Sequence, residues 1–215
     1  MRGDVILVGE EHRRAARLIV ESLVETIRSM DRRFTLTVAG ESGSGKSETG
    51  QALAEALHEH AIRAVVLQQD DYYVLPPRSN DAARRANFCW VGTTEVRLDL
   101  LDSHLQAARA GASSIVKPLV IFDEDRIDEE TVSFDGADVV LAEGVYTSLC
   151  DHVDRRVFID RDRLETLQHR MNRGREESDP FLEQVLTREH EIISQHRARA
   201  DIIITRDYDV EFVRE

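Results

Sequence analysis

The eight residues from Gly40 to Ser47 have the types and spacing needed to hold phosphate groups. They read GESGSGKS, which fits the pattern G-x-x-x-x-G-K-[ST] at every fixed position. Gly43 and Gly45 allow close backbone approach, so successive N–H groups can surround an anion. Lys46 can reach the β and γ phosphates of a nucleotide, and Ser47 offers a hydroxyl to a magnesium ion. The residues predicted to contact a nucleoside triphosphate are Gly40, Glu41, Ser42, Gly43, Ser44, Gly45, Lys46, Ser47 and Glu48.

Carboxylates follow two of the predicted strands, where an open α/β sheet binds its ligands. Asp70 comes after a short apolar run and could accept a proton from a hydroxyl that attacks the γ-phosphate, with Asp71 as the less favoured neighbour. An acidic surface turn is the alternative interpretation of this stretch. Glu143 ends a second apolar run and resembles a Walker B acid, which holds magnesium or its water shell. The sequence therefore predicts Asp70 as the catalytic base, and Ser47 with Glu143 at the metal.

Basic residues gather later in the chain, at Arg161, Arg163, Arg170, Arg173 and Arg175. Phosphoryl transfer needs cations near the charge that spreads over the γ-phosphate, and an arginine-bearing lid supplies them while excluding water. Arg170, Arg173 and Arg175 surround Gly174 and are expected in such a lid at about residues 170–178. Arg170 and Arg173 would act in catalysis, and Arg175 would contact the nucleotide. Arg161 and Arg163 fit a solvated helix face instead.

The elements that must position these residues alternate along the chain. Apolar residues at helical spacing predict helices at 15–30, 53–60, 98–108, 162–173 and 181–198. Short apolar runs predict strands at 34–39, 64–67, 119–122, 139–142, 157–159 and 202–204. Strands separated by helices imply βαβ units, a parallel sheet and helices on both faces. We expect one three-layer α/β domain at 32–215, preceded by a helical extension at 1–31.

Composition limits the classes of protein that fit. Of 215 residues 41% are hydrophobic, which is enough for a sizeable core, and a net charge of -13 argues against a protein that coats nucleic acid. No apolar run has the length of a membrane helix, and no signal peptide opens the chain, so no membrane partner is expected. Cys89 and Cys150 lie far apart, which argues against a disulfide framework and for a cytoplasmic location. Among 28 basic residues only Lys46 and Lys117 are lysine.

A nucleotide-binding chain of this length fits a small-molecule kinase best. A GTPase would carry an Asn-Lys-x-Asp element for guanine, which this sequence lacks. A motor or helicase would be larger and would carry further motifs. The expected reaction is in-line transfer of a phosphoryl group from ATP, with Mg²⁺, to a hydroxyl of a small molecule.

Taken together, these residues resemble the phosphoribulokinase/uridine kinase family of P-loop kinases, from about Phe34 to Asp207. Asp70-Asp71-Tyr72-Tyr73 is similar to the family's Asp-Ser-Phe-Tyr element, whose first Asp is the catalytic base. Ala142-Glu143-Gly144 resembles a Val-Glu-Gly element, and Arg173-Gly174-Arg175 resembles the Arg-Gly-Arg of the lid. The run from Ala200 to Ile204 is the family's late Ala-Asp-Ile-Ile-Ile. The resemblance implies a P-loop nucleoside triphosphate hydrolase-type fold with a mainly parallel sheet and a helical lid.

The resemblance is weaker where the family binds its acceptor. Asn87-Phe88 matches the start of an Asn-Phe-Asp-His-Pro segment, but Cys89, Trp90 and Val91 follow it. A tyrosine that the family carries before Asp123 is missing as well. The residues implied to contact the acceptor are Asp70, Tyr73, Phe88, Trp90, Arg126 and Glu143, although Trp90 could equally pack under a loop.

Three functions stay open at this point. A uridine or cytidine kinase is the first expectation, and a kinase of another polyol, such as a pentose phosphate, pantothenate or glycerate, is the second. The third is a nucleotide-binding regulator that has lost catalysis, against which Lys46, Ser47, Asp70 and Glu143 speak together. A homo-oligomer is suggested only by analogy with the family.

Overall fold

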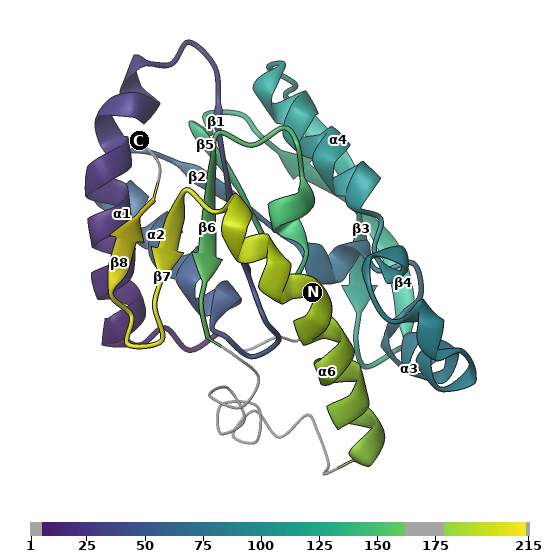
Figure 1. The fold of residues 1–215 in the computed structure, drawn as a ribbon. Coiled ribbons are helices and arrows are strands. Elements are labelled where there is room, and N and C mark those ends of the chain that lie inside the picture. Colours follow the sequence, from purple (N-terminus) through teal and green to yellow (C-terminus); the bar gives the residue numbers. More distant parts are fainter. Residues whose placement is uncertain (1–5, 162–178, 214–215) are drawn as a thin grey trace.

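The main sheet has six strands in the order β2-β5-β1-β6-β7-β8 (Figure 1). The structure, a computed structural model, describes residues 6–161 and 179–213. The strands are β1 (Phe34–Gly40), β2 (Ala64–Gln68), β5 (Val139–Glu143), β6 (Arg155–Ile159), β7 (Ile202–Ile204) and β8 (Val210–Phe212). Neighbours from β2 to β7 are parallel, and only β8 pairs antiparallel, with β7. The carboxyl ends of β2, β5 and β1 therefore lie side by side at one edge.

Helices cover both faces of this sheet, as the alternation of helices and strands predicts. The helices are α1 (Glu10–Ser29), α2 (Lys46–Glu59), α3 (Pro77–Ala86), α4 (Leu98–Arg109) and α6 (Pro180–Ile193). Short 3₁₀ turns connect them: η1 (Gln69–Tyr72), η2 (Phe88–Trp90), η3 (Thr93–Glu95), η4 (Thr147–Leu149) and η5 (Ser194–Arg199). No helix of the described residues is long and apolar enough to cross a lipid bilayer.

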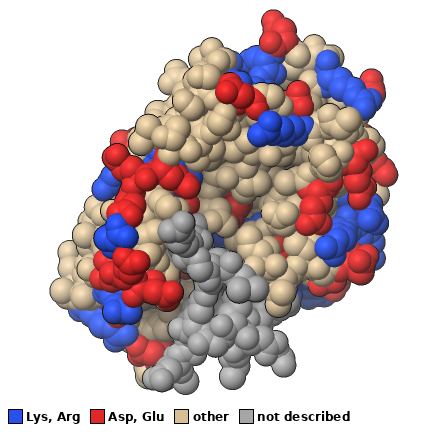
Figure 2. Space-filling view, turned by 180° about the vertical axis from the view of Figure 1, so that it is seen from behind, with Lys and Arg blue, Asp and Glu red and all other residues tan. Residues whose placement is uncertain are grey.

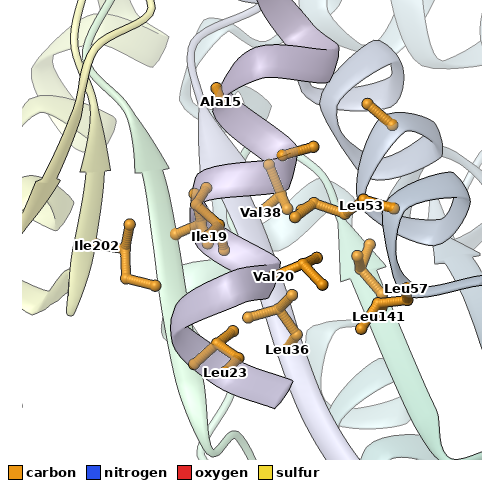
Figure 3. Close-up of a cluster of buried hydrophobic side chains, with 14 of the residues drawn as sticks. Ala15, Ile19, Val20, Leu23, Leu36, Val38, Leu53, Leu57, Leu141 and Ile202 are labelled. Carbon is orange, nitrogen blue, oxygen red and sulfur yellow. The ribbon is translucent and has the colours of Figure 1, made fainter. Parts of the chain in front are cut away.

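Two hydrophobic clusters hold the three layers together because side chains alternate along each strand. Leu36, Val38 and Leu141 face α1 and α2, where Ile19 and Leu53 meet them (Figure 3). On the other face, Ala39, Val140 and Phe158 pack with Leu101 and Leu105 of α4. Helix α1 shares the first cluster with the P-loop helix α2, so the N-terminal segment contributes to the same core as the sheet.

One predicted strand belongs elsewhere. The run 119–122 forms part of β3 (Ser114–Ile121), which pairs antiparallel with β4 (Arg126–Ser133) in a separate two-stranded sheet. The expectation that this run joins the parallel sheet was therefore wrong. Strand β4 has no fully buried residue and mixes exposed polar residues with half-buried ones, so its sequence has too few apolar residues to show a buried strand.

The helical predictions near the C-terminus also need adjustment. Helix α6 ends at Ile193, and residues 194–199 continue as a 3₁₀ turn, whereas the sequence predicted a helix to residue 198. The predicted helix at 162–173 and the lid at 170–178 lie outside the described residues.

Candidate active site

The loop between β1 and α2 has the backbone shape that its glycines permit. Gly43 and Gly45 adopt φ values of +79° and +93°, which side chains with a Cβ rarely tolerate. Gly45 is the N-cap of α2, so the positive end of that helix faces the loop. The Nζ of Lys46 donates to the carbonyl of Glu41 at 2.8 Å. Burial lowers the pKa of Lys46, against the opposing effect of Glu143 and Asp70.

Helix α1 supports this loop from behind. The Nε2 of His12 lies 3.0 Å from the hydroxyl of Tyr208, which also accepts from Nη1 of Arg161 at 2.5 Å. Since the N–H of Gly9 donates to Nδ1 of His12, the imidazole donates through Nε2. A Cβ at Gly45 would lie 2.9 Å from that Nε2. The loop is thus packed against a hydrogen-bonded cluster formed by both ends of the chain.

Ser47 and Glu143 are brought together beside the loop. The hydroxyl of Ser47 donates to a carboxylate oxygen of Glu143 at 3.0 Å. Burial raises the pKa of Glu143 to about 7, and the negative charge of Asp70 adds to the shift. No cluster of three His, Cys, Asp or Glu suited to a metal occurs among residues 6–161 and 179–213. A hydroxyl beside one carboxylate fits Mg²⁺, which takes few protein oxygens and completes its shell with phosphates and water.

The two adjacent aspartates after β2 point to different surroundings. Asp70 in η1 is exposed, and its charge acts on the pKa values of both Lys46 and Glu143. Asp71 is buried, where it accepts from Nζ of Lys117 at 2.6 Å and from the backbone N–H of Val120 at 3.0 Å. Asp71 thus joins the turn to the β3–β4 hairpin, whereas the charge of Asp70 acts on the phosphate loop.

A buried charged network lies next to Asp70. Nε of Arg84 donates to Glu95 at 2.5 Å, and Nη2 of the same side chain donates to Glu95 at 3.0 Å and to Glu189 of α6 at 3.3 Å. The pKa of Tyr73 is raised well above its usual value by burial, by Asp70 and by Glu189. The sequence predicted Tyr73 in the site but did not predict the three charged residues beside it, which come from α3, η3 and α6.

The remaining residues expected at the acceptor lie in different surroundings. The indole N–H of Trp90 donates to Oδ1 of Asn80 at 2.8 Å, so this ring is held by α3. Phe88 is exposed, and its ring meets that of Phe181 edge to face at 6.1 Å. Arg126 bonds to Glu124 and Asp128 of its own hairpin. Arg170, Arg173 and Arg175 lie outside the described residues.

We use the name phosphate side for the loop 40–47 together with the start of α2. The name acceptor side covers α3, η2, η3, the β3–β4 hairpin and α6. Helix α6 links the two, because His190 Nδ1 lies 2.6 Å from a carboxylate oxygen of Glu41 in the loop. One signal for the acceptor side was present in the sequence: Lys117, one of only two lysines, is buried beside the site. No motif spacing in the sequence marks the other charged residues of this side, Arg84, Glu95 and Glu189.

A comparison with known families decides what this arrangement belongs to. The profile of the phosphoribulokinase / uridine kinase family matches residues 35–211, which includes both sides of the site. The chain belongs to this family of P-loop kinases.

Individual relatives of this family member are distant. A bifunctional alpha-galactosidase/sucrose kinase, AgaSK, from Mediterraneibacter gnavus is 28% identical over 84% of this chain, which spans only 21% of that protein. A uridine kinase from Staphylococcus epidermidis is 26% identical over 81% of this chain and 88% of its own. The structure of phosphoribulokinase from Rhodobacter spheroides superposes with a TM-score of 0.66 at 12% identity, covering 82% of this chain and 71% of that one. The last similarity shows the fold alone.

Proposed function

We propose that this P-loop kinase transfers the γ-phosphoryl group of ATP to a hydroxyl of a small molecule. The observation that carries the proposal is the position of Asp70, an exposed carboxylate at the carboxyl end of β2 that acts electrostatically on Lys46 and Glu143. A base in this position can accept the proton of a hydroxyl as its oxygen attacks the γ-phosphorus.

The other residues have separable roles in this proposal. The loop amides and Lys46 hold the phosphates, with the N-terminus of α2 adding positive potential. Ser47 and Glu143 would hold Mg²⁺, which neutralises charge on the phosphate oxygens when bound. By resemblance to the family, Arg170, Arg173 and Arg175 would add positive charge around the transferring group.

Uridine or cytidine is the first acceptor to test, because the relatives that match most of this chain over most of their own length include uridine kinases. A sugar is the second candidate. It is favoured by the departure of Cys89 and Trp90 from the family's acceptor segment, and by the sucrose kinase relative that aligns over 84% of this chain.

Release of ADP tests the proposal directly. The protein would be incubated with ATP and Mg²⁺ and a panel of uridine, cytidine, pentoses, sucrose, ribulose 5-phosphate, pantothenate and glycerate. Turnover that depends on an acceptor, and that is lost in Asp70→Asn, supports a kinase. Tight Mg·ATP binding without turnover on any acceptor would favour a nucleotide-binding regulator instead.

A further inference from the structure

Two cations of the acceptor side, the half-buried Arg84 and the buried Lys117, are each held between two carboxylates. Arg84 contacts Glu95, which has no exposed surface, and Glu189, which is 6% exposed. Lys117, which is 4% exposed, lies 2.6 Å from Asp71 and 2.7 Å from Glu130. Each group of three carries more negative than positive charge when its carboxylates are ionised.

The same pattern extends to the rim of the site. Arg126 on the hairpin bonds to Glu124 and Asp128. Figure 2 shows acidic and basic side chains interleaved over the flanks of the molecule, without a broad patch of positive charge on that face. A phosphate or carboxylate placed near Arg84, Lys117 or Arg126 would therefore meet a cation that already has two acidic partners.

Lys117 and Glu130 also line a cavity of about 410 Å³ that reaches Ser47 and Glu143. The described polar residues around this cavity are two glutamines, Gln51 and Gln68, three acids and the paired Lys117, together with Ser47. Such a lining offers hydrogen bonds to hydroxyls and offers no free positive charge to an anion.

Glu189 has an oxygen left over for a ligand. Its Oε2 is buried and has no hydrogen-bond partner among the described residues. The same is true of the hydroxyl oxygen of Tyr146. Buried polar atoms are nearly always hydrogen-bonded, so each orphan calls for an explanation. Glu189 lies beside Arg84 of α3, its charge raises the pKa values of Tyr146 and Tyr73, and burial raises its own pKa to about 7. Above this pH the second oxygen of the carboxylate can accept a hydrogen bond from one hydroxyl of the acceptor, while Asp70 would take the proton of the hydroxyl that reacts.

We propose that the acceptor is a neutral, polyhydroxylated molecule such as a sugar or nucleoside, and that the carboxylate of Glu189 binds one of its hydroxyls. The inference rests on the proposed kinase function and narrows its substrate class. It excludes acceptors that carry a phosphate or carboxylate, including pentose phosphates, pantothenate and glycerate.

Matched pairs of acceptors test the charge preference in the wild-type protein. Glycerol with glycerate, fructose with fructose 6-phosphate, and ribulose with ribulose 5-phosphate differ by an anionic group, and uridine and cytidine complete the neutral set. In each pair that is used, we expect kcat/KM to be about 100-fold higher for the neutral member, because like charges in proximity cost several kcal/mol. Preferential turnover of the anionic members would overturn the inference and leave the kinase function standing. No turnover with any acceptor would overturn both.

Glu189→Gln tests the residue. At pH 8, where Glu189 with its pKa of about 7 is largely ionised, the variant should raise the KM of the neutral acceptor about tenfold while the KM of ATP stays within about twofold, since a hydrogen bond to a charged group is replaced by a weaker one. It should also narrow the gap between neutral and anionic acceptors, which a merely structural role would not do.

Glu191→Gln is the matched control, because it makes the same change on the exposed side of α6, where Glu191 pairs with Arg188. If both variants raised the acceptor KM equally, or if Glu189→Gln raised the KM of ATP in parallel, Glu189 would not be the residue that binds the acceptor hydroxyl. If Glu189→Gln did not fold, the paired acceptors would still decide the question in the wild-type protein.

Discussion

On the phosphate side, eight consecutive residues form the binding loop, and neighbouring elements support it through single contacts such as His12 to Tyr208. On the acceptor side, the charged groups come from positions as far apart as Arg84 and Glu189, and they bond to one another in largely buried groups of one cation and two acids. The first arrangement takes its ligand-binding groups from one stretch of chain, whereas the second commits most of its charges to the fold. Substitutions on the phosphate side should therefore change activity, and those on the acceptor side should change stability as well.

Asp70→Asn should give the largest effect on activity. We expect kcat to fall by about 10²–10⁴, the contribution typical of a general base, with Mg·ATP affinity and melting temperature nearly unchanged because Asp70 is exposed. Acceptor-dependent ADP release and nucleotide titration measure the two quantities. Asp71→Asn is the comparison, and it should lower stability because its carboxylate holds buried Lys117. Wild-type turnover in Asp70→Asn would remove this residue from the mechanism.

Lys117→Met should give the largest effect on stability. It leaves buried Asp71 without its cation, and breaking a buried ion pair on one side costs about 3–5 kcal/mol. Urea unfolding measures the loss. Arg126→Met removes two exposed ion pairs from the same hairpin and should cost less than about 1 kcal/mol. Similar losses in the two variants would show that the hairpin does not depend on the buried pair.

The contrast also explains which parts of the molecule were predictable. The loop 40–47 could be identified from sequence because its function depends on contiguous residues and on glycines with few alternatives. Strands 34–39 and 139–142 were identified because both faces are buried, which requires continuous apolar runs. The pairing of β3 with β4, and the meeting of Arg84, Glu95 and Glu189, depend on tertiary packing, which leaves no periodic signal in one sequence. Resemblance to the family favoured Asp70 over Asp71 as the catalytic base. The structure adds a physical reason, because the contact with Lys117 occupies the carboxylate of Asp71.

Glu143→Gln should have a smaller effect on stability, and that effect should depend on pH. The folded protein keeps the proton of Glu143 up to about pH 7, whereas the unfolded chain releases it near 4.5. Between these values the folded state binds more protons, so this group makes the free energy of unfolding fall as pH rises, until the fall levels off above pH 7. The glutamine variant lacks this fall, so its stability relative to wild type should rise by about 1–3 kcal/mol from pH 5 to pH 8 without nucleotide.

Urea unfolding at the two pH values checks this expectation, and Mg·ATP should stabilise the variant less than the wild type. Glu59→Gln on the exposed end of α2 provides the control, with no pH-dependent difference expected. If the free energies of unfolding of wild type and Glu143→Gln differed by the same amount at both pH values, Glu143 would be ionised throughout this range.

His12→Ala should give the smallest effect and tests whether α1 supports the phosphate side. It removes the hydrogen bond to Tyr208 and the ring that packs behind Gly45, so we expect a loss of about 0.5–1.5 kcal/mol in stability. Because the loop would gain freedom that nucleotide binding must remove, the Kd of Mg·ATP should rise by roughly two- to fivefold, while the acceptor KM stays unchanged. Arg17→Ala on the same helix, which removes only an exposed contact with Glu59 of α2, should leave the Kd unaltered. If both alanine variants weakened ATP binding equally, the effect would come from the docking of α1 as a whole. If His12→Ala alone did so, the contact behind Gly45 would be the means by which the N-terminal helix holds the loop in shape.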